Sequence, residues 1–229
     1  MLRIFIGTDN RQPVAANVLQ SSLYATSTQP LAITQLRINQ LPLKRMESTE
    51  FTYTRWLVPW LCEFKGWALF MDADMVCLSD ISKLFDLADP KHDVMVVKGP
   101  ERFEWPSLML FNCEKCVKLT PEYLEDGEPA TFDWAHSVGG LPHEWNFLVG
   151  YDKPREQALV LHYTLGIPLF PEVRGFGHEV EWFTYYHDFL NTCSWLELMG
   201  DTVHAQKVME FLRQKCLIHK QNFSMPSGL

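Results

Sequence analysis

Short apolar runs that end in polar turns recur along the chain. The run LRIFIG at residues 2–7 stops at Thr8-Asp9-Asn10, and the run WALFM at residues 67–71 stops at Asp72-Ala73-Asp74. Runs this short and this apolar are typical of buried strands. By the same criterion, further strands are predicted at residues 31–38, 93–98, 106–111 and 159–161.

Between and after these strands, apolar residues recur at helical spacing. Helices are predicted at residues 13–24, 52–63, 113–124, 180–198 and 201–218, with a shorter turn at residues 80–85 capped by Asp80. Gly66 and Gly200 mark helix ends, as glycine commonly does. Strands that alternate with helices predict an α/β fold, with a mixed central sheet flanked by helices and further helices at the C-terminus.

Length and composition set the number of domains and exclude some partners. A chain of 229 residues, 47% of them apolar, can build one α/β domain with a large core. The net charge of -8 argues against broad contact with nucleic acid or an anionic membrane, because both attract basic surfaces. We expect a single domain over residues 1–229, with an α/β core at 1–178 and a helical extension at 179–229.

Membrane insertion and disulfide bonds are not expected. No apolar run reaches the roughly eighteen residues of a transmembrane helix, and the N-terminal run meets Asp9 before a signal-peptide core forms. We therefore expect a cytoplasmic protein. Its six cysteines are then expected to be reduced thiols, with disulfides as the minority alternative.

Asp72 and Asp74 are the strongest candidates for chemistry. Side chains two residues apart in an extended segment point to the same side, so both carboxylates can face one cation, and hard oxygen ligands suit Mg²⁺ or Mn²⁺. The spacing alone is weak support, since it also arises by chance and describes a solvated turn equally well. The buried strand directly before it favours a site, because two charges there cost desolvation unless something compensates them.

The string FTYTRWLVPWLCEFKGWALFMDADMVCLSDI resembles the core of glycosyltransferase family 8-like enzymes. Four further pieces match in order, so that the resemblance covers about residues 2–170: RIFIGTDN, SLMLFN, LPHEWN and HYTLGIP. The resemblance implies the GT-A fold, a UDP-sugar donor carrying glucose or galactose before other sugars, and Mn²⁺ or Mg²⁺ as cofactor. It also implies transfer of the hexose to a carbohydrate or glycoconjugate acceptor, with retention of anomeric configuration.

The resemblance assigns roles to individual residues. It implies that Asp72, Asp74 and His162 are metal ligands, a set that suits Mn²⁺ better than Ca²⁺. The implied nucleotide-sugar-binding residues are Gly7, Thr8, Asp9, Arg55, Asp72, Ala73 and Asp74, and the candidates for catalytic contacts to the sugar are Asn112, Asp133 and Asn146. Without the resemblance, the turn after Gly7 is an ordinary capping turn and His162 a structural residue.

The chain departs from the family pattern after His162. Many members continue to a Lys-Pro-Trp whose Lys touches the diphosphate, but this chain reads HYTLGIPLF and lacks both Lys and Trp. Arg55, Lys153 or Arg174 is then expected to offset the phosphate charge together with the metal. The chain also shows no clear carboxylate nucleophile, which favours same-face attack assisted by the leaving phosphate.

Other interpretations stay open. A nucleotidyltransferase shares acidic residues at a strand end but ordinarily has a longer, Gly-rich, basic N-terminal loop. A catalytically degenerate nucleotide-sugar-binding module agrees with the missing Lys. Cys113-Glu114-Lys115-Cys116 has the spacing of a zinc or redox motif, but no second pair completes four ligands, so helical thiols are the plain interpretation.

Overall fold

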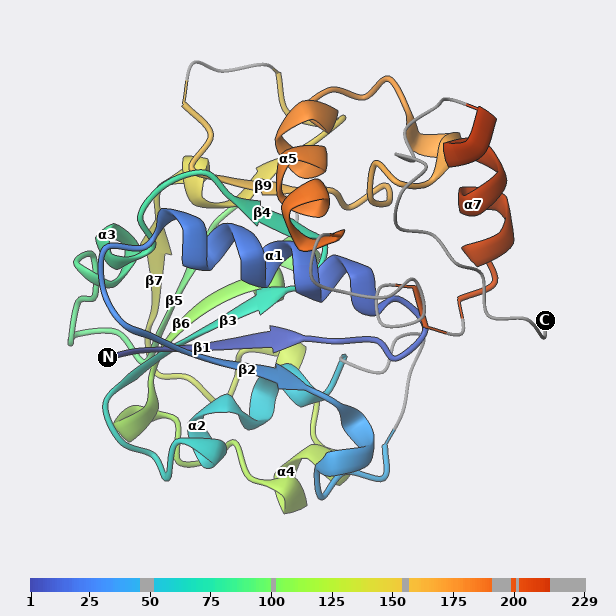
Figure 1. Cartoon of the computed structure of the whole chain (residues 1–229). Coiled ribbons are helices and arrows are strands. Elements are labelled where there is room, and N and C mark those ends of the chain that lie inside the picture. The colour runs from blue at the N-terminus through green and yellow to red at the C-terminus, as the bar shows by residue number, and fades with distance from the viewer. Residues whose placement is uncertain (46–51, 100–101, 154–156, 191–198, 201, 215–229) are drawn as a thin grey trace.

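The structure, a computed structural model, describes residues 1–45, 52–99, 102–153, 157–190, 199–200 and 202–214. Its strands are β1 Leu2–Gly7, β2 Leu31–Leu36, β3 Trp67–Asp72, β4 Met75–Cys77, β5 Val94–Val97, β6 Leu108–Asn112, β7 Val138–Leu141, β8 Phe147–Leu148 and β9 Val160–His162. Its helices are α1 Pro13–Thr26, α2 Val58–Leu61, α3 Ser82–Phe85, α4 Pro121–Asp126, α5 Glu179–Leu190 and α7 Ala205–Gln214. Helices flank the sheet on both faces, as predicted (Figure 1).

The central sheet has six strands in the order β2-β1-β3-β6-β5-β7. β1 pairs in parallel with β2 and β3, whereas β6 runs antiparallel to both β3 and β5, which makes the sheet mixed. A second, three-stranded sheet has the order β4-β9-β8. In this sheet Met75 of β4 pairs with His162 of β9. The segment directly after β3 therefore lies beside the end of β9.

Alternate residues of the central strands point to opposite faces of the sheet and belong to two separate hydrophobic cores. Ile4, Ile6, Leu69 and Met71 face α1, α5 and the second sheet, and their core cluster continues into those elements. Phe5 and Phe70 lie on the other face in the cluster that includes residues of α2 and α4. Because both faces are covered, β3, β5 and β6 are buried throughout almost their whole length, which explains their continuous apolar sequences.

Most predicted elements are confirmed, and prolines account for two differences. The predicted helix at residues 113–124 is instead a short 3₁₀ turn followed by α4, because Pro121 lacks an N–H and holds Thr120 extended before it. Thr120 then caps α4 by accepting a hydrogen bond from the Tyr123 N–H at 3.3 Å. The predicted helix at residues 52–63 is a 3₁₀ turn and the short α2, which contains Pro59.

Both predicted C-terminal helices are present in the part of the chain that the structure describes, and the second begins later than predicted. α5 covers the start of the predicted helix at 180–198, whose remainder lies outside the described residues, and α7 lies within the predicted 201–218. α5 packs beside α1 above the sheet (Figure 1). Every described helix is too short or too polar to cross a lipid bilayer.

Candidate metal centre

The carboxyl ends of β1 and β3 lie side by side and deliver the predicted acidic site. Gly7 is the register partner of Asp72 across the parallel pair, so the turn after β1 and the Asp72-Ala73-Asp74 turn share one edge of the sheet. The backbone N–H of Tyr163 donates to the Asp74 carbonyl at 2.9 Å, which ties the end of β9 to the same point. Segments far apart in sequence therefore converge here.

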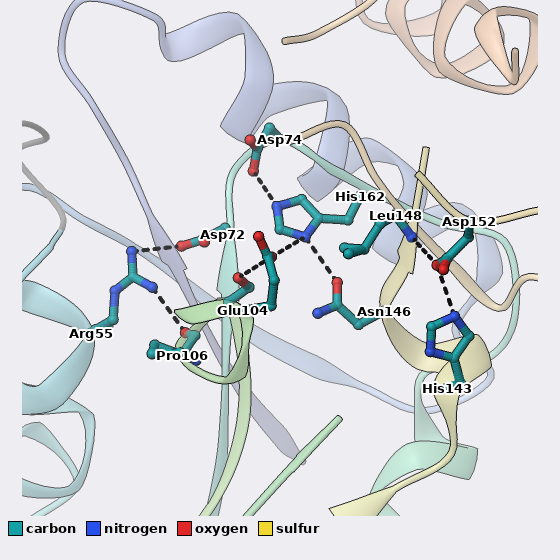
Figure 2. Close-up of polar contacts among 11 residues, drawn as sticks. Arg55, Asp72, Asp74, Glu104, Pro106, His143, Asn146, Leu148, Asp152 and His162 are labelled. Atoms are coloured by element: carbon teal, nitrogen blue, oxygen red, sulfur yellow. Dashed lines mark hydrogen bonds and ion pairs between the residues drawn. The ribbon is translucent and has the colours of Figure 1, made fainter. Parts of the chain in front are cut away.

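Asp72, Asp74 and His162 form one compact group, as predicted. Each offers one ligand atom, and these atoms all lie within 4.8 Å of one another. His162 Nε2 lies 3.3 Å from Asp74 Oδ1 (Figure 2). Asp72 and His162 are buried, and their arrangement of two carboxylates and one imidazole is a donor set for a divalent transition metal or Mg²⁺.

Arg55, in the 3₁₀ turn Thr54–Leu57, forms an ion pair with Asp72. Its Nη2 lies 3.1 Å from Asp72 Oδ1, and its Nη1 donates to the Pro106 carbonyl at 3.0 Å. The guanidinium also lies over the Phe70 ring, 5.2 Å from its centroid. Arg55, which the resemblance implies as a donor-binding residue, is therefore held in the buried wall of the site beside Asp72 (Figure 2).

Asn146 fixes the orientation of the His162 ring. Its Oδ1 lies 2.9 Å from His162 Nδ1, on the edge of the imidazole away from Asp74 (Figure 2). An amide oxygen accepts a proton from Nδ1, which leaves Nε2 with a lone pair directed toward the acidic group. Asn146, predicted as a contact to the sugar, lies at the site as a partner of the candidate metal ligand.

The pKa values of Asp72 and His162 are both raised. Burial raises the pKa of Asp72 to about 6, with the Arg55 guanidinium opposing the rise and the Asp74 carboxylate adding to it. Burial alone would lower the pKa of His162, but the carboxylates of Asp74, Asp72 and Glu104 outweigh it and hold that pKa above its usual value. The site thus concentrates negative charge that water does not solvate.

The turn after β1 lies at the same sheet edge but is already hydrogen-bonded. Thr8 is buried, and its N–H donates to the Leu36 carbonyl at 3.2 Å. Arg11 Nη2 donates a hydrogen bond to Asp9 Oδ2 at 2.6 Å. Burial alone would raise the pKa of Asp9, but the hydrogen bonds and charge of Arg11 outweigh it and lower that pKa. Gly200, at φ +55°, backs the turn so closely that a Cβ there would lie 2.8 Å from the Asn10 carbonyl oxygen.

Two predicted site residues are not brought to this edge. Asn112 pairs with Trp67 at the opposite end of β3, five residues from Asp72 and so about 16 Å away along the strand. Its Nδ2 instead donates to the His92 carbonyl at 3.4 Å. Asp133 is exposed in a turn near Tyr123 of α4. Neither position supports the predicted contact to a sugar held by Asp72 and Asp74.

The other basic residues considered for phosphate binding have different surroundings. The Arg174 guanidinium lies between two rings, 4.3 Å from the Phe183 centroid and 4.7 Å from that of Phe211. Lys153 is exposed after β8. Arg55 is the candidate that the structure places against the acidic group.

Glu104 is a neighbour of the site that sequence reasoning did not select. It belongs to the 3₁₀ segment Arg102–Ser107 before β6, and its Oε2 lies 3.9 Å from His162 Nδ1. No local motif marks it, because the sequence around it reads as an ordinary connection between two strands. Its relation to His162 depends on the tertiary fold alone.

The CxxC segment is structural in the described part of the chain. Cys113 and Cys116 are free and fully buried, and the Cys116 thiol contacts the carbonyls of Asp93 and Asn112 at 3.2 Å. Cys62 and Cys77 are also free and buried. Reduced thiols at these four positions agree with the sequence prediction, and Cys193 and Cys216 lie outside the described residues.

Solved structures with this arrangement of strands are glycosyltransferases. The galactosyltransferase LgtC, solved with donor and acceptor sugar analogues, superposes with a TM-score of 0.60 at 12% identity, over 82% of this chain and 96% of LgtC. GlyE of Streptococcus pneumoniae TIGR4 gives 0.59 at 16% identity, over 98% and 67% of the two chains. The bifunctional glycosyltransferase WbbM gives 0.59 at 15% identity over 91% of this chain, which spans only 51% of WbbM. The chain therefore has the predicted GT-A fold.

Comparison of sequences adds a curated relative. No protein-family model matches the chain. Protein CDI of Arabidopsis thaliana is 33% identical over 205 residues, and the match covers 73% of this chain and 79% of the relative. This degree of identity over most of both proteins shows common family membership, and the chain belongs to the family of Protein CDI.

Proposed function

We propose that the chain is a metal-dependent glycosyltransferase of the family 8-like type, which transfers a hexose from a UDP-sugar to a carbohydrate or glycoconjugate acceptor. The observation that carries the proposal is the Asp72, Asp74 and His162 group at the carboxyl ends of strands in a GT-A fold. The order of motifs in the sequence, from RIFIGTDN to HYTLGIP, supports the choice of family.

The residues of this group fit a divalent cation. Asp72 Oδ1 and Asp74 Oδ1 are buried. Arg55 faces Asp72 Oδ1 at 3.1 Å, but it is one guanidinium beside the carboxylates of Asp72, Asp74 and Glu104, and a divalent cation would balance the remaining negative charge. Asn146 directs His162 Nε2 toward the same point. Asp72, Asp74 and His162 would hold Mn²⁺ or Mg²⁺, and the bound cation supplies Lewis-acid stabilisation of a leaving diphosphate.

Other residues near the proposed metal ligands would bind the donor or orient a ligand. Arg55, already paired with Asp72, would offset phosphate charge in place of the missing Lys, since a guanidinium suits phosphate oxygens. Asn146 keeps the His162 ring fixed while the donor binds. The turn Gly7, Thr8 and Asp9 lies at the same sheet edge, where the nucleoside end of the donor would bind.

Retention of anomeric configuration follows from the family resemblance. A double displacement needs a carboxylate at the anomeric carbon, and we propose instead same-face attack, in which the departing phosphate assists the incoming acceptor hydroxyl. The bond from the anomeric carbon to the diphosphate breaks, the bond to the acceptor oxygen forms, and the hydroxyl proton passes to the phosphate. Arg55 and the cation that Asp72, Asp74 and His162 would hold need only keep the diphosphate in place.

Release of UDP from a panel of UDP-sugars, with and without Mn²⁺, tests this proposal. We expect Mn²⁺-dependent release, fastest with UDP-glucose or UDP-galactose, and none above background for Asp74→Ala. Binding of a UDP-sugar without release would identify a degenerate binding module. Equal release by the wild type and Asp74→Ala would overturn the assignment of the site.

A further inference from the structure

Two cysteine thiols contact each other at the end of the central sheet that lies away from the candidate metal centre. Cys62 directly follows α2, Cys113 directly follows β6, and their side chains are hydrogen-bonded to each other. Both lie in the hydrophobic core on the face of the sheet that α2 covers (Figure 1). Asn112, the residue before Cys113, pairs with Trp67 at the start of β3, whereas Asp72 ends that strand. The thiol pair is therefore separate from the residues that would bind a cation.

One tight turn of the backbone keeps the two cysteines close. The Lys65 N–H donates to the Cys62 carbonyl at 3.0 Å, and the Cys113 N–H donates to the Gly66 carbonyl at 2.9 Å. The two residues after Cys62 have φ of 51° and 54°, a left-handed conformation that reverses the chain before β3. α2 also packs against the 3₁₀ turn that begins at Cys113. Two cysteines can be bridged only where their backbones are already close, and this turn fulfils that condition.

Cys62 is the more reactive thiol of the pair. Its residue is 6% exposed, whereas Cys113 is fully buried. The Arg3 guanidinium, held by the Trp67 carbonyl at 3.0 Å, lies near the Cys62 sulfur. The hydrogen bond from the Cys113 thiol lowers the pKa of Cys62, with burial opposing this effect and the charge of Arg3 adding to it. A partly accessible thiol of low pKa with a second thiol behind it is typical of redox-sensitive cysteines.

The other two cysteines that the structure describes have different surroundings. Burial raises the pKa of Cys77 to about 11, and its thiol donates to the Ser79 carbonyl at 2.9 Å. Burial also raises the pKa of Cys116, whose thiol contacts the carbonyls of Asp93 and Asn112 at 3.2 Å. Backbone carbonyls inside the core engage both thiols, so Cys77 and Cys116 serve as internal controls.

We propose that Cys62 and Cys113 form a modification site at which hydrogen peroxide produces an intrachain disulfide. The Cys62 thiolate attacks one peroxide oxygen, the O–O bond breaks, and the hydroxide that leaves takes a proton from solvent, so that Cys62 becomes a sulfenic acid. The Cys113 sulfur then attacks the Cys62 sulfur, the S–O bond breaks, and the thiol proton leaves with the hydroxide as water. Two thiols and one peroxide thus give one disulfide and two waters.

The order of the two steps follows from the hydrogen bond between the thiols. While Cys62 is a thiolate, its negative charge holds the Cys113 proton and raises the pKa of Cys113, together with burial. Conversion of Cys62 to a neutral sulfenic acid removes that charge, and the Cys113 thiol is then free to act on the oxidised sulfur. The inference is independent of the proposed glycosyl transfer.

Peptide mapping by mass spectrometry of the full-length wild type is the direct test. The reduced, folded protein is treated with hydrogen peroxide, its remaining thiols are alkylated after unfolding, and the chain is digested. We expect a cross-linked pair of peptides that joins Cys62 to Cys113 and that dithiothreitol separates. Cys77 and Cys116 should be recovered as alkylated free thiols.

Trapping of the sulfenic acid with dimedone tests the order of events. We expect strong dimedone labelling of Cys62 in Cys113→Ala, where the second thiol is missing, and little in the wild type, where the disulfide forms instead. Cys116→Ser is the matched control, because its hydroxyl can still donate to the same carbonyls, and it should form the disulfide as the wild type does. If Cys113→Ala does not fold, Cys62→Ala decides, since its Cys113 should stay reduced under peroxide.

Three results would overturn the inference. One is the absence of a link between Cys62 and Cys113 in the peroxide-treated wild type, or a link from Cys62 to another cysteine. Another is equal dimedone labelling of Cys62 in the wild type and in Cys113→Ala. The third is oxidation of Cys113 in Cys62→Ala to the same extent as in the wild type. Failure to release UDP from any UDP-sugar would contradict the proposed function and leave this inference intact.

Discussion

The two ends of the central sheet each bury an aspartate, and they treat it in opposite ways. At one end, Asp93 is 3% exposed, and its Oδ2 accepts a hydrogen bond of 2.7 Å from the backbone N–H of His136. At the other end, Asp72 is 7% exposed, and its Oδ1 accepts no hydrogen bond from the described residues and faces Arg55 at 3.1 Å. The Asp93 carboxylate is paired with a backbone N–H, whereas the Asp72 carboxylate shares its one guanidinium partner with the nearby carboxylates of Asp74 and Glu104.

The difference indicates which end of the sheet is built for a ligand. A buried carboxylate that accepts a backbone N–H can be explained by folding alone. Asp72 has a raised pKa because burial is only partly offset by Arg55, and Asp74 and Glu104 lie nearby. Perturbed groups that converge on one point are typical of functional sites. The contrast between Asp72 and Asp93 therefore supports the metal centre independently of any resemblance.

The largest expected effect is that of Arg55→Ala on stability. Removal of Arg55 leaves Asp72 buried without its ion-pair partner, and breaking a buried pair typically costs about 3–5 kcal/mol of unfolding free energy. Urea denaturation followed by circular dichroism measures the change. Lys65→Ala, which breaks the exposed pair with Glu63, is the control and should not move the midpoint. A midpoint equal to that of the wild type for Arg55→Ala would show that Asp72 is solvated.

The next effect concerns metal affinity. Asp74→Ala removes one of three ligands, and we expect Mn²⁺ binding to weaken by more than about 100-fold, beyond the range typical of outer partners. EPR titration of Mn²⁺ gives the dissociation constant. Asp93→Ala, at the opposite end of the sheet, should bind Mn²⁺ as tightly as the wild type wherever it folds. An equal loss of Mn²⁺ affinity in Asp74→Ala and Asp93→Ala would contradict the assignment of the metal centre to the Asp74 end of the sheet.

Acid should weaken Mn²⁺ binding steeply. The cation needs an ionised Asp72, whose pKa lies at about 6, and a neutral His162, whose pKa is held above its usual value. Affinity should therefore fall by about tenfold per unit once the pH is below the His162 pKa, and by about a hundredfold per unit below pH 6, where the Asp72 proton competes as well. Metal titrations between pH 5 and 8 check this. A constant affinity over that range would mean that Asp72 is not a ligand.

The same raised pKa sets the sign of a stability effect. The folded state holds the Asp72 proton to about pH 6, whereas the unfolded chain releases it near pH 4. The metal-free protein should therefore lose stability as pH rises from about 4 to about 6, and saturating Mn²⁺ should oppose that loss at neutral pH. Comparing wild type with Asp72→Asn over this range isolates the contribution of Asp72.

The smallest effect is expected at Asp93. Asp93→Asn keeps an oxygen that can accept the His136 N–H but removes its charge, which should cost about 1 kcal/mol, the difference between a charged and a neutral hydrogen bond. Urea denaturation gives the value, and Mn²⁺ affinity should not change. An increase in stability would show that burial of the Asp93 charge costs more than its hydrogen bond to His136 offsets.

Sequence reasoning predicted the residues of the site that follow strands of known direction. Asp72 and Asp74 follow an apolar run that forms a parallel pair with β1, and the family motifs imply His162 as a ligand beside them and Arg55 as a donor-binding residue, which the structure places against Asp72. The position of Asn112 cannot be predicted from the sequence, because the apolar pattern of a strand does not indicate its direction in the sheet. β6 is antiparallel to β3, so its carboxyl end lies at the edge with Asp93. Glu104 was missed because only the tertiary fold brings its connection to His162.

The central claim is that Asp72, Asp74 and His162 bind a cation that in turn holds a UDP-sugar. Thermal unfolding of the wild type and of Asp74→Ala, with Mn²⁺, with UDP-glucose or UDP-galactose, and with both, tests it most directly. Ligand at about 100 times its dissociation constant stabilises by about 2.7 kcal/mol, which for a chain of this size raises the melting temperature by about 5–10 °C. We predict that Mn²⁺ alone stabilises the wild type, that the sugar nucleotide adds a further rise of this order only when Mn²⁺ is present, and that Asp74→Ala shows neither rise. A rise without Mn²⁺, or an equal rise in Asp74→Ala, would contradict the account.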